Sequence, residues 1–595
     1  MYPKGKSGIS GLVGGCLVFI TAAVVLFLKR HVLAKAAALS IWSADRVFIA
    51  DFLERPGGLL EYCGVFLTQT GHAPQLGIFV MLVILAGIVL LCRKICGRTA
   101  VALIPAACIL LFWTGMDYNL HTMRAQGYVF SQMMGILATS AVIAAFQDSK
   151  HPVLFAVLAL VIGYPVIGAY AVAAGLGIAV SALFKSGTGR ISAPVAALCA
   201  VLVPFACSHF IYSHLDTTYT FLAGMPYFDF NGNEWRWAPI AAACLSLVLL
   251  PALKKAGEWK WVGNFSSIAL SLLICAAIVQ FSYRDKNFHE EIRMEQAVEA
   301  NDWDKVLDIA RKMDSPTRIG VMYRNIALLY KGEILESMFT YPDGESHINT
   351  KAPISMTMVS APVSYFYYGM LQYSARWAME CTMLYQPGVQ RYKYLAKAAL
   401  FSGNEKPELI EKYFRIIEGN LFQKAWVRKY RAMLYDRSLL EQDEEYKMAM
   451  ALNEYEEPSF MSSAVVENTI LRLFASLEEP HGKVLELALA SVLTVKKPEL
   501  FWDKYDQWFK EGHPMTKVLA EAALLYAYMD RDEVRLASVL DRIGGAESRT
   551  LKEFNAFSEA ASRSRGAAVN EDYFRKRFGD TYWYYCYFVK ELITD

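Results

Sequence analysis

Residues 76–92, LGIFVMLVILAGIVLLC, contain no charged side chain and are followed directly by Arg93 and Lys94. An apolar helix of about 20 residues can cross a lipid bilayer, and basic residues beside it favour the cytoplasmic surface. Six more apolar stretches of this kind occur in the first half of the chain, at 10–28, 99–115, 126–146, 192–213, 237–253 and 262–282. The sequence therefore predicts a membrane-embedded helical bundle.

The apolar stretch 152–184 is too long for one crossing and short for two. Gly163, Tyr164 and Pro165 interrupt it, and a proline biases the residue before it away from helix. If this stretch is two short spans, the total is about nine crossings, and most Lys and Arg residues of the loops lie on one side. We therefore expect a cytoplasmic N-terminus, with the chain after residue 283 on the opposite side of the membrane.

The two halves of the 595-residue chain differ in composition. Residues 1–282 contain 18 Lys and Arg and 10 Asp and Glu, whereas residues 283–595 contain 41 and 47. Charged residues make up 19% of the whole chain and hydrophobic residues 55%, which excludes a wholly soluble enzyme, a secreted disulfide-rich protein and a disordered regulator. The pattern predicts a transmembrane domain at 1–283 and a soluble domain at 284–595. The mildly acidic second half gives no support for nucleic-acid binding.

The soluble half has the pattern of paired helices with short polar turns between them. The predicted pairs are 290–300 with 302–312, 390–401 with 407–417, 484–493 with 500–510, and 516–529 with 532–543. Repeated helix pairs stack into solenoids, so we expect an all-α chain that ends in an α-solenoid resembling tetratricopeptide repeats. An ordinary helical domain is the alternative.

Three other features of the soluble half lead to expectations. Residues 340–358 are polar with two prolines, which predicts a long loop. The aromatic clusters 365–368 and 582–588 can stack on sugar or peptide, but such clusters more often form a core between helices. Cys381 and Cys586 are the only cysteines in this half, and the sequence does not establish whether they are bridged.

The long loop at 29–75 contains the candidate chemistry. Residues 41–53 have an apolar face with interleaved charges, which suits a helix in the membrane interface. A turn at 54–58 and a second amphipathic stretch at 59–70 follow. The loop contains the carboxylates of Asp45, Asp51, Glu54 and Glu61, together with Arg55. A carboxylate can take a proton from an acceptor, and an arginine can neutralise a phosphate leaving group.

A second polar segment follows the third predicted span. Asp117, Asn119, His121 and Arg124 occur within ten residues, and they can complete a polar pocket with the first loop. Arg236 stands alone at the end of the next long loop on the same side, 214–236. The alternative for Arg124 and Arg236 is interfacial snorkelling.

This order of parts resembles the GT-C superfamily of membrane glycosyltransferases, and within it the O-mannosyltransferases that end in tetratricopeptide repeats. The resemblance implies a polyprenyl-phosphate sugar as donor and an essential aspartate in the first loop, which by position is Asp45 or Asp51. It makes Arg55, Arg124 and Arg236 the phosphate-side candidates, with Glu54, Glu61 and His121 as further substrate-binding candidates. A divalent metal is a possible cofactor, because some members need one. Residues 52–62, FLERPGGLLEY, also resemble multi-span membrane proteins of Bacteroidota, which implies a bacterial inner membrane.

Two other functions stay open at this stage. The chain can be a non-catalytic, membrane-anchored scaffold whose solenoid recruits envelope proteins, with Asp45 and Asp51 on a solvated face beside Arg46 and Arg55. In the enzyme hypothesis the solenoid binds a protein or glycan acceptor instead. A transporter is the least favoured, because the predicted spans contain almost no ionisable residue to bind a coupling ion.

Overall fold

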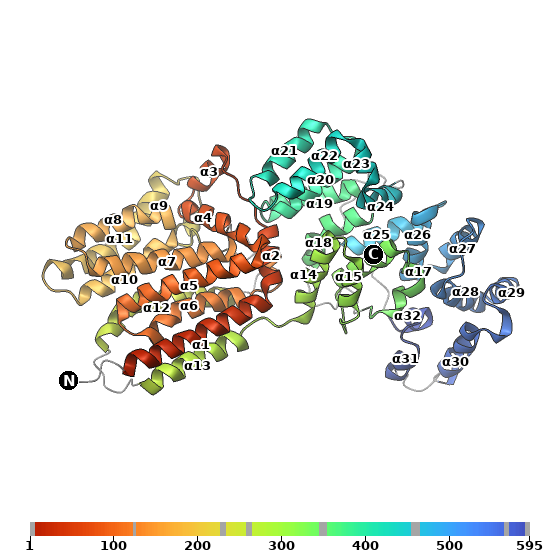
Figure 1. The fold of residues 1–595 in the computed structure, drawn as a ribbon, viewed down its shortest axis with the longest axis horizontal. Coiled ribbons are helices and arrows are strands. Elements are labelled where there is room, and N and C mark those ends of the chain that lie inside the picture. Colours follow the sequence, from red (N-terminus) through yellow and green to blue (C-terminus); the bar gives the residue numbers. More distant parts are fainter. Residues whose placement is uncertain are drawn as a thin grey trace. The chain divides into compact units, whose positions relative to one another are not determined.

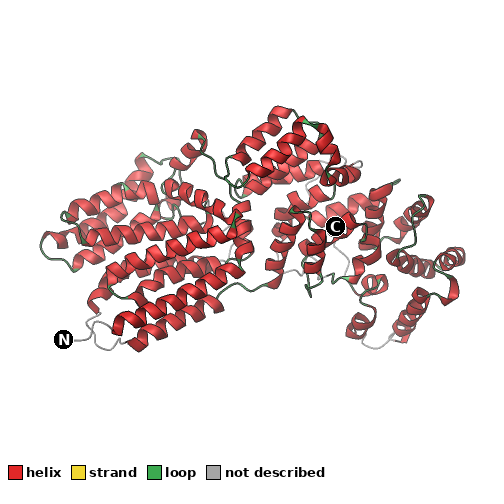
Figure 2. Ribbon diagram, viewed as in Figure 1, coloured by secondary structure: helices red, strands yellow, loops and turns green. Residues whose placement is uncertain are grey.

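The computed structural model describes residues 6–122, 127–226, 234–256, 264–343, 354–453, 465–563 and 571–589. Every regular element in these residues is a helix and none is a strand (Figure 2), which confirms the all-α prediction. The chain forms two compact units. The first contains Met1–Arg284, Thr382–Lys393 and Glu411–Lys429, and the second contains Asp285–Cys381, Tyr394–Ile410 and Tyr430–Asp595.

The first unit contains the apolar helices (Figure 1). Among the described residues, five are long and apolar enough to cross a membrane: α1 (Lys6–Leu28), α5 (Pro74–Cys96), α7 (Tyr128–Gln147), α11 (Thr188–Phe210) and α12 (Ala238–Ala256). Four further apolar helices are shorter: α6 (Thr99–Thr114), α8 (Pro152–Val161), α10 (Ala169–Leu183) and α13 (Asn264–Gln280). These helices follow the order of the predicted apolar stretches.

Helix α5 illustrates how the sequence sets the limits of these helices. Pro74 occupies its first turn, where the missing N–H costs nothing, and Gly97 ends it with a φ of 75°, a conformation that favours glycine. Leu76, Phe79 and Val83 point outward and are exposed even though they are apolar. An apolar side chain in this position suits contact with lipid rather than water.

The segment 152–184 forms two packed helices, α8 and α10, which are joined by the short α9 (Gly163–Ile167). Gly168, with a φ of 59°, separates α9 from α10. Small buried residues on α8, α10 and α11, among them Ala156, Ala182 and Ala196, form a core with Phe146 and Ile178. Small side chains let helices approach closely, which is how helices associate in a lipid environment.

The first loop forms α2 (Arg30–Ala38), α3 (Arg46–Leu53), α4 (Gly58–Thr68) and the 3₁₀ turn η1 (Gln69–His72). The prediction of a helix over 41–53 is wrong for its first five residues. The reason is that the Asp45 carboxylate accepts a hydrogen bond from the N–H of Val47 and caps α3 there. The predicted turn at 54–58 is confirmed, and α4 packs against α7 and α9.

The turn between α3 and α4 depends on a close approach of glycines. Gly57 has a φ of 77°, and its N–H donates to the carbonyl of Pro165 at 2.9 Å. A Cβ at position 57 would lie 3.2 Å from the backbone of Gly168. Glycine at this position therefore permits both the left-handed conformation and the contact with the start of α10.

Two segments from the second half of the sequence pack onto the first loop as part of the first unit. The N–H of Val389 donates to the carbonyl of Ser40 at 3.1 Å, and Lys35 Nζ donates to Gln390 Oε1 at 2.9 Å. The N–H of Trp42 donates to Asn420 Oδ1 at 3.0 Å. Sequence analysis had no signal for this association, because the contacts join residues that are hundreds of positions apart.

The second unit is built from consecutive helices. Those lying wholly or mainly within it are α14 (Lys286–Glu299), α15 (Trp303–Ala310), α16 (Arg318–Lys331), α17 (Ile334–Ser337), α18 (Ile354–Tyr367), α19 (Leu371–Leu384), α20 (Val389–Ser402), α23 (Arg437–Gln442), α24 (Glu444–Asn453), α25 (Val466–Ser476), α26 (Gly482–Thr494), α27 (Phe501–Lys510), α28 (Lys517–Asp530), α29 (Glu533–Arg542), α30 (Arg549–Arg563), α31 (Glu571–Phe578) and α32 (Tyr582–Phe588). Of the two remaining helices, α21 (Pro407–Glu418) belongs largely to the first unit, and α22 (Lys424–Tyr435) is divided between the two units after Lys429.

The turns of two of the four predicted pairs share one feature. Asn301 and Arg531 adopt a positive φ, and the following residues, Asp302 and Asp532, cap the next helix. A left-handed residue followed by an aspartate cap reverses the chain within a few residues. Consecutive helices such as α14 and α15, and α28 and α29, pack against each other.

The aromatic clusters are mostly core, with Tyr587 of the second cluster exposed. Tyr365, Phe366 and Tyr367 are fully buried, as are Tyr582 and Trp583. Cys381 and Cys586 are both free thiols. The predicted loop at 340–358 is wrong at its end because α18 begins at Ile354, and residues 344–353 lie outside the described residues.

Candidate functional site at the loop end of the first unit

One end of the first unit gathers polar side chains, and we call it the loop end because α2, α3 and α4 lie there. Lys29, just after α1, donates from Nζ to the carbonyl of Thr114 at 2.6 Å and to that of Tyr283 at 2.8 Å. Thr68, at the end of α4, donates to the carbonyl of Gly127 at 2.9 Å. These bonds bring together the first loop, the α6–α7 connection and the residues that follow α13.

The two aspartates proposed as catalytic face solvent. Asp45 is exposed, and its carboxylate is engaged as the cap of α3. Asp51 and Glu54 are also exposed. Among the described residues, no cation lies within ion-pair distance of any of the three, so the structure does not bring them together with the arginines. Their predicted roles stay predictions.

Arg55 and Glu61 do come together. Arg55 Nη2 lies 3.0 Å from Glu61 Oε2, and the Glu61 side chain is only 9% exposed. Burial raises the pKa of Glu61 to about 7, and the neighbouring Arg55 partly opposes that rise. A carboxyl with a pKa near neutrality can accept or donate a proton under physiological conditions.

Arg236 pairs with Asp117. Arg236 Nη1 donates to Asp117 Oδ1 at 2.6 Å, and Nη2 donates to Oδ2, so the guanidinium binds both carboxylate oxygens. Asp117 also accepts hydrogen bonds from the backbone and side-chain N–H groups of Asn119, at 3.0 and 2.8 Å. The short 3₁₀ turns η2 (Tyr118–His121) and η4 (Glu234–Trp237) position these residues. Asp117 was noted in the sequence for its crowded loop but was not among the proposed site residues.

His121 lies beside two cations. Burial, with the charges of Lys35 and Arg391, holds the pKa of His121 well below its usual range, so its imidazole is neutral at pH 7. Arg391 comes from the second half of the sequence, which is why sequence analysis could not associate it with His121. Arg124 lies outside the described residues.

Several buried polar atoms at the loop end have no hydrogen-bond partner among the described residues. They are Arg55 Nε, Trp113 Nε1, Thr114 Oγ1, Asn119 Oδ1, Thr122 Oγ1, Tyr128 Oη and Arg236 Nε. Leaving a buried donor or acceptor unpaired costs about 1–3 kcal/mol, and native proteins satisfy nearly all such groups. Two of these atoms belong to the guanidinium groups of the two ion pairs, and the others lie at or between the end of α6 and the start of α7. The loop end therefore retains donors and acceptors with which a polar ligand can bond.

The described residues contain no group of three or more His, Cys, Asp and Glu side chains that could hold a metal ion. At the loop end, both Asp117 oxygens already bind Arg236. The described part of the loop end therefore provides no ligand set for the divalent metal considered above.

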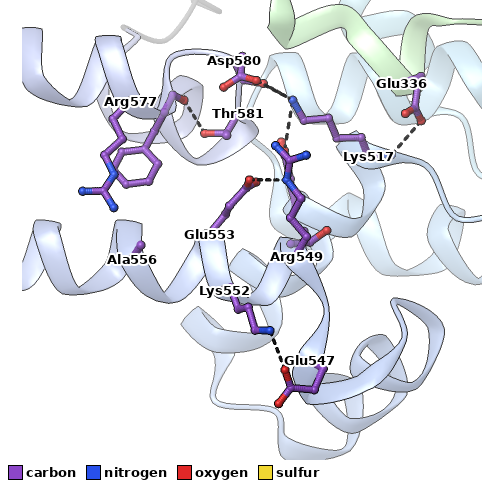
Figure 3. Close-up of a pocket in the computed structure, with 13 residues that line it drawn as sticks. Glu336, Lys517, Glu547, Arg549, Lys552, Glu553, Ala556, Arg577, Asp580 and Thr581 are labelled. Carbon is purple, nitrogen blue, oxygen red and sulfur yellow. Dashed lines mark hydrogen bonds and ion pairs between the residues drawn. The ribbon is translucent and has the colours of Figure 1, made fainter.

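The second unit contains a separate pocket of about 990 Å³ (Figure 3). Five carboxylates and four basic side chains line it, with Phe578, Ala556 and two threonines. Lys517 Nζ lies 3.0 Å from Asp580, and Arg549 pairs with Glu553 at 2.7 Å. Such a lining suits a polar ligand that carries both signs of charge, such as a peptide segment.

The described residues define an all-helical protein with five helices long and apolar enough to span a membrane, and with two polar sites in separate units. The chain belongs to the family described as "Family of unknown function (DUF6057)", which matches residues 7–589. No curated protein and no solved structure matches the chain.

Proposed function

We propose that the protein is a membrane glycosyltransferase of GT-C type that uses a polyprenyl-phosphate-linked sugar at the loop end of the first unit. The observation that carries the proposal is the ion pair of Arg55 with the buried Glu61, in which Arg55 Nε has no hydrogen-bond partner among the described residues. A polar site at the end of an apolar bundle suits a substrate that has a lipid tail and a charged headgroup.

The proposed topology has nine crossings, made by α1, α5, α6, α7, α8, α10, α11, α12 and α13, with the N-terminus in the cytoplasm of a bacterial inner membrane. Both the loop end and the second unit are then extracytoplasmic. Basic residues at the opposite end of the bundle support this orientation. There Lys94 pairs with Asp148, and Lys185 donates to the carbonyl of Phe146.

The chemistry follows from the two pairs. An acceptor oxygen attacks the anomeric carbon, the bond from that carbon to the phosphate oxygen breaks, and the phosphate leaves with the electron pair. Glu61 takes the acceptor proton, since its pKa of about 7 suits a general base. Arg55 and Arg236 neutralise the charge that develops on the leaving phosphate. This proposal moves the role of the base from Asp45 or Asp51 to Glu61.

The second unit is proposed to be a solenoid resembling tetratricopeptide repeats that binds the protein or glycan acceptor. Consecutive packed helices, and the same turn geometry at Asn301 and Arg531, support a repeat architecture. The pocket lined by Lys517, Arg549 and Asp580 is the proposed acceptor site.

Complementation of a deletion strain tests the enzyme. Cells with E61Q are expected to lose the glycan and to accumulate the polyprenyl-phosphate sugar, at wild-type protein levels, when both are measured by mass spectrometry. Cells with D45N or D51N are expected to keep the glycan, because these carboxylates face water. If D51N abolished the glycan and E61Q retained it, Asp51 and not Glu61 would be the general base.

The scaffold is the second candidate, and the exposure of Asp45 and Asp51 favours it. If it is correct, the deletion strain keeps all of its glycans, and E61Q has no effect on them. Envelope proteins should then be recovered with the wild-type chain but not with K517E, which reverses a charge in the second-unit pocket.

A further inference from the structure

The turn between α21 and α22 presents two apolar side chains on the surface of the first unit. Leu421 is 53% exposed and Phe422 is 40% exposed, whereas their neighbours Asn420 and Gln423 are buried. The buried side chains of Asn420 and Gln423 therefore fix the turn with Leu421 and Phe422 facing outward. Exposed apolar side chains become informative when they are part of a larger apolar surface.

Three contacts hold this turn against the first loop. Asn420 Oδ1 accepts from the N–H of Trp42 at 3.0 Å, and the N–H of Leu421 donates to Gln69 Oε1 at 2.9 Å. The ring of Phe422 lies 6.4 Å from the ring of His72, measured between centroids. Because η1 ends at His72 and α5 begins at Pro74, the turn lies where an apolar helix enters the membrane.

The neighbouring surface also points to lipid. Leu76 and Phe79, in the first turns of α5, are 43% and 63% exposed and continue an apolar surface along that helix. On the turn's other side, Lys424 and Arg428 are exposed in the first turns of α22. Apolar side chains flanked by basic ones are the pattern of a segment that lies in an anionic membrane surface.

We propose that the α21–α22 turn is a membrane anchor that inserts Leu421 and Phe422 into the lipid surface, with Lys424 and Arg428 at anionic headgroups. The second half of the sequence then reaches the same membrane surface as the first loop. This anchor depends on α5 crossing the membrane and not on the proposed enzyme.

Photo-crosslinking in the full-length protein tests the anchor. The photoreactive p-benzoylphenylalanine replaces Phe422, and in a second protein it replaces Val534, an exposed apolar residue (81%) of the second unit. Both proteins are reconstituted in vesicles with equal amounts of phosphatidylethanolamine and phosphatidylglycerol. After irradiation, lipid adducts at position 422 are expected to exceed those at 534 at least about tenfold, as insertion in the surface implies.

The headgroup part of the proposal has its own measurement. Phosphatidylglycerol is expected to exceed its half share among the adducts at position 422, and K424E/R428E should remove this excess. Equal lipid yields at 422 and 534, or adducts at 422 to protein only, would overturn the anchor. An unchanged lipid ratio in K424E/R428E would overturn the role of the two basic residues. Thermal unfolding establishes that each variant is folded.

Discussion

Arg236 binds both carboxylate oxygens of Asp117, a residue 119 positions earlier in the sequence. This two-point contact joins the start of α12 to the α6–α7 connection, and the side chains are only 22% and 15% exposed. A bidentate pair of this kind fixes geometry as well as charge. It therefore fixes the start of α12 relative to the α6–α7 connection at the loop end.

Removing one partner of this pair should destabilise the first unit. D117N leaves the guanidinium without its counter-charge, and we expect a loss of about 1–3 kcal/mol, seen as a lower melting temperature of the purified protein. D148N is the matched control, because its pair with Lys94 is exposed and at the opposite end; it should cost less than about 1 kcal/mol. Equal losses in the two variants would contradict a structural role for Asp117.

Gly57 should tolerate substitution less well than Gly97. Both have a positive φ, but a Cβ at position 57 meets the backbone of Gly168, whereas nothing lies within 4 Å of one at position 97. G97A measures the cost of the left-handed conformation alone, about 1–2 kcal/mol. G57A should cost clearly more in thermal unfolding, and a similar loss in both variants would show that the contact with Gly168 is not tight.

Glu445 is the centre of a buried network in the second unit. It accepts hydrogen bonds from Lys397 Nζ at 2.7 Å, Tyr367 Oη at 2.7 Å and Tyr430 Oη at 2.8 Å. E445Q leaves a buried ammonium unpaired, so we expect a loss of about 3–5 kcal/mol. K397M/E445Q removes both charges and should recover part of the loss in denaturant unfolding. A double variant that is less stable than E445Q would argue against the charge as the cause.

Glu521 should make stability depend on pH. Burial raises its pKa from 4.5 to about 7, although the N–H of Tyr582 donates to it at 2.7 Å. Between pH 4.5 and 7 the unfolded chain releases this proton while the folded chain retains it, so the free energy of unfolding falls as pH rises. E521Q cannot titrate, and its melting temperature relative to wild type should increase from pH 5 to pH 8. A constant difference would contradict this assignment.

The glycosyl-transfer proposal also predicts a pH profile. Because the pKa of Glu61 is about 7, transfer should rise as pH increases through neutrality and Glu61 loses its proton. The measurement is the transfer rate of reconstituted protein with a polyprenyl-phosphate sugar as donor. A rate that is flat between pH 6 and pH 8 would contradict Glu61 as the base.

The helical elements could be predicted from the sequence, because each depends on neighbours a few positions away. The apolar stretches and the polar turns at Asn301 and Asp532 are local signals. The predicted interruption at Gly163–Pro165 is wrong in its position, because these residues lie within α9 and the helix breaks are at Ile162 and Gly168. In the first loop, a side-chain contact decided the outcome: the carboxylate of Asp45 starts α3 later than the apolar pattern indicated. The loop at 340–358 was predicted too long, since composition does not reveal that α18 begins at Ile354.

The sequence by itself determined the all-helical chain, the apolar first half and the set of polar residues from which a site can be built. Only the tertiary structure decided which of those residues meet. It left Asp45 and Asp51 in solvent and joined Arg55 to Glu61 and Arg236 to Asp117. It also brought Gln390 and Asn420 to the first loop and Arg391 close to His121. The physical reason is that hydrophobic periodicity is a property of neighbouring residues, whereas ion pairs and buried hydrogen bonds depend on how distant helices pack.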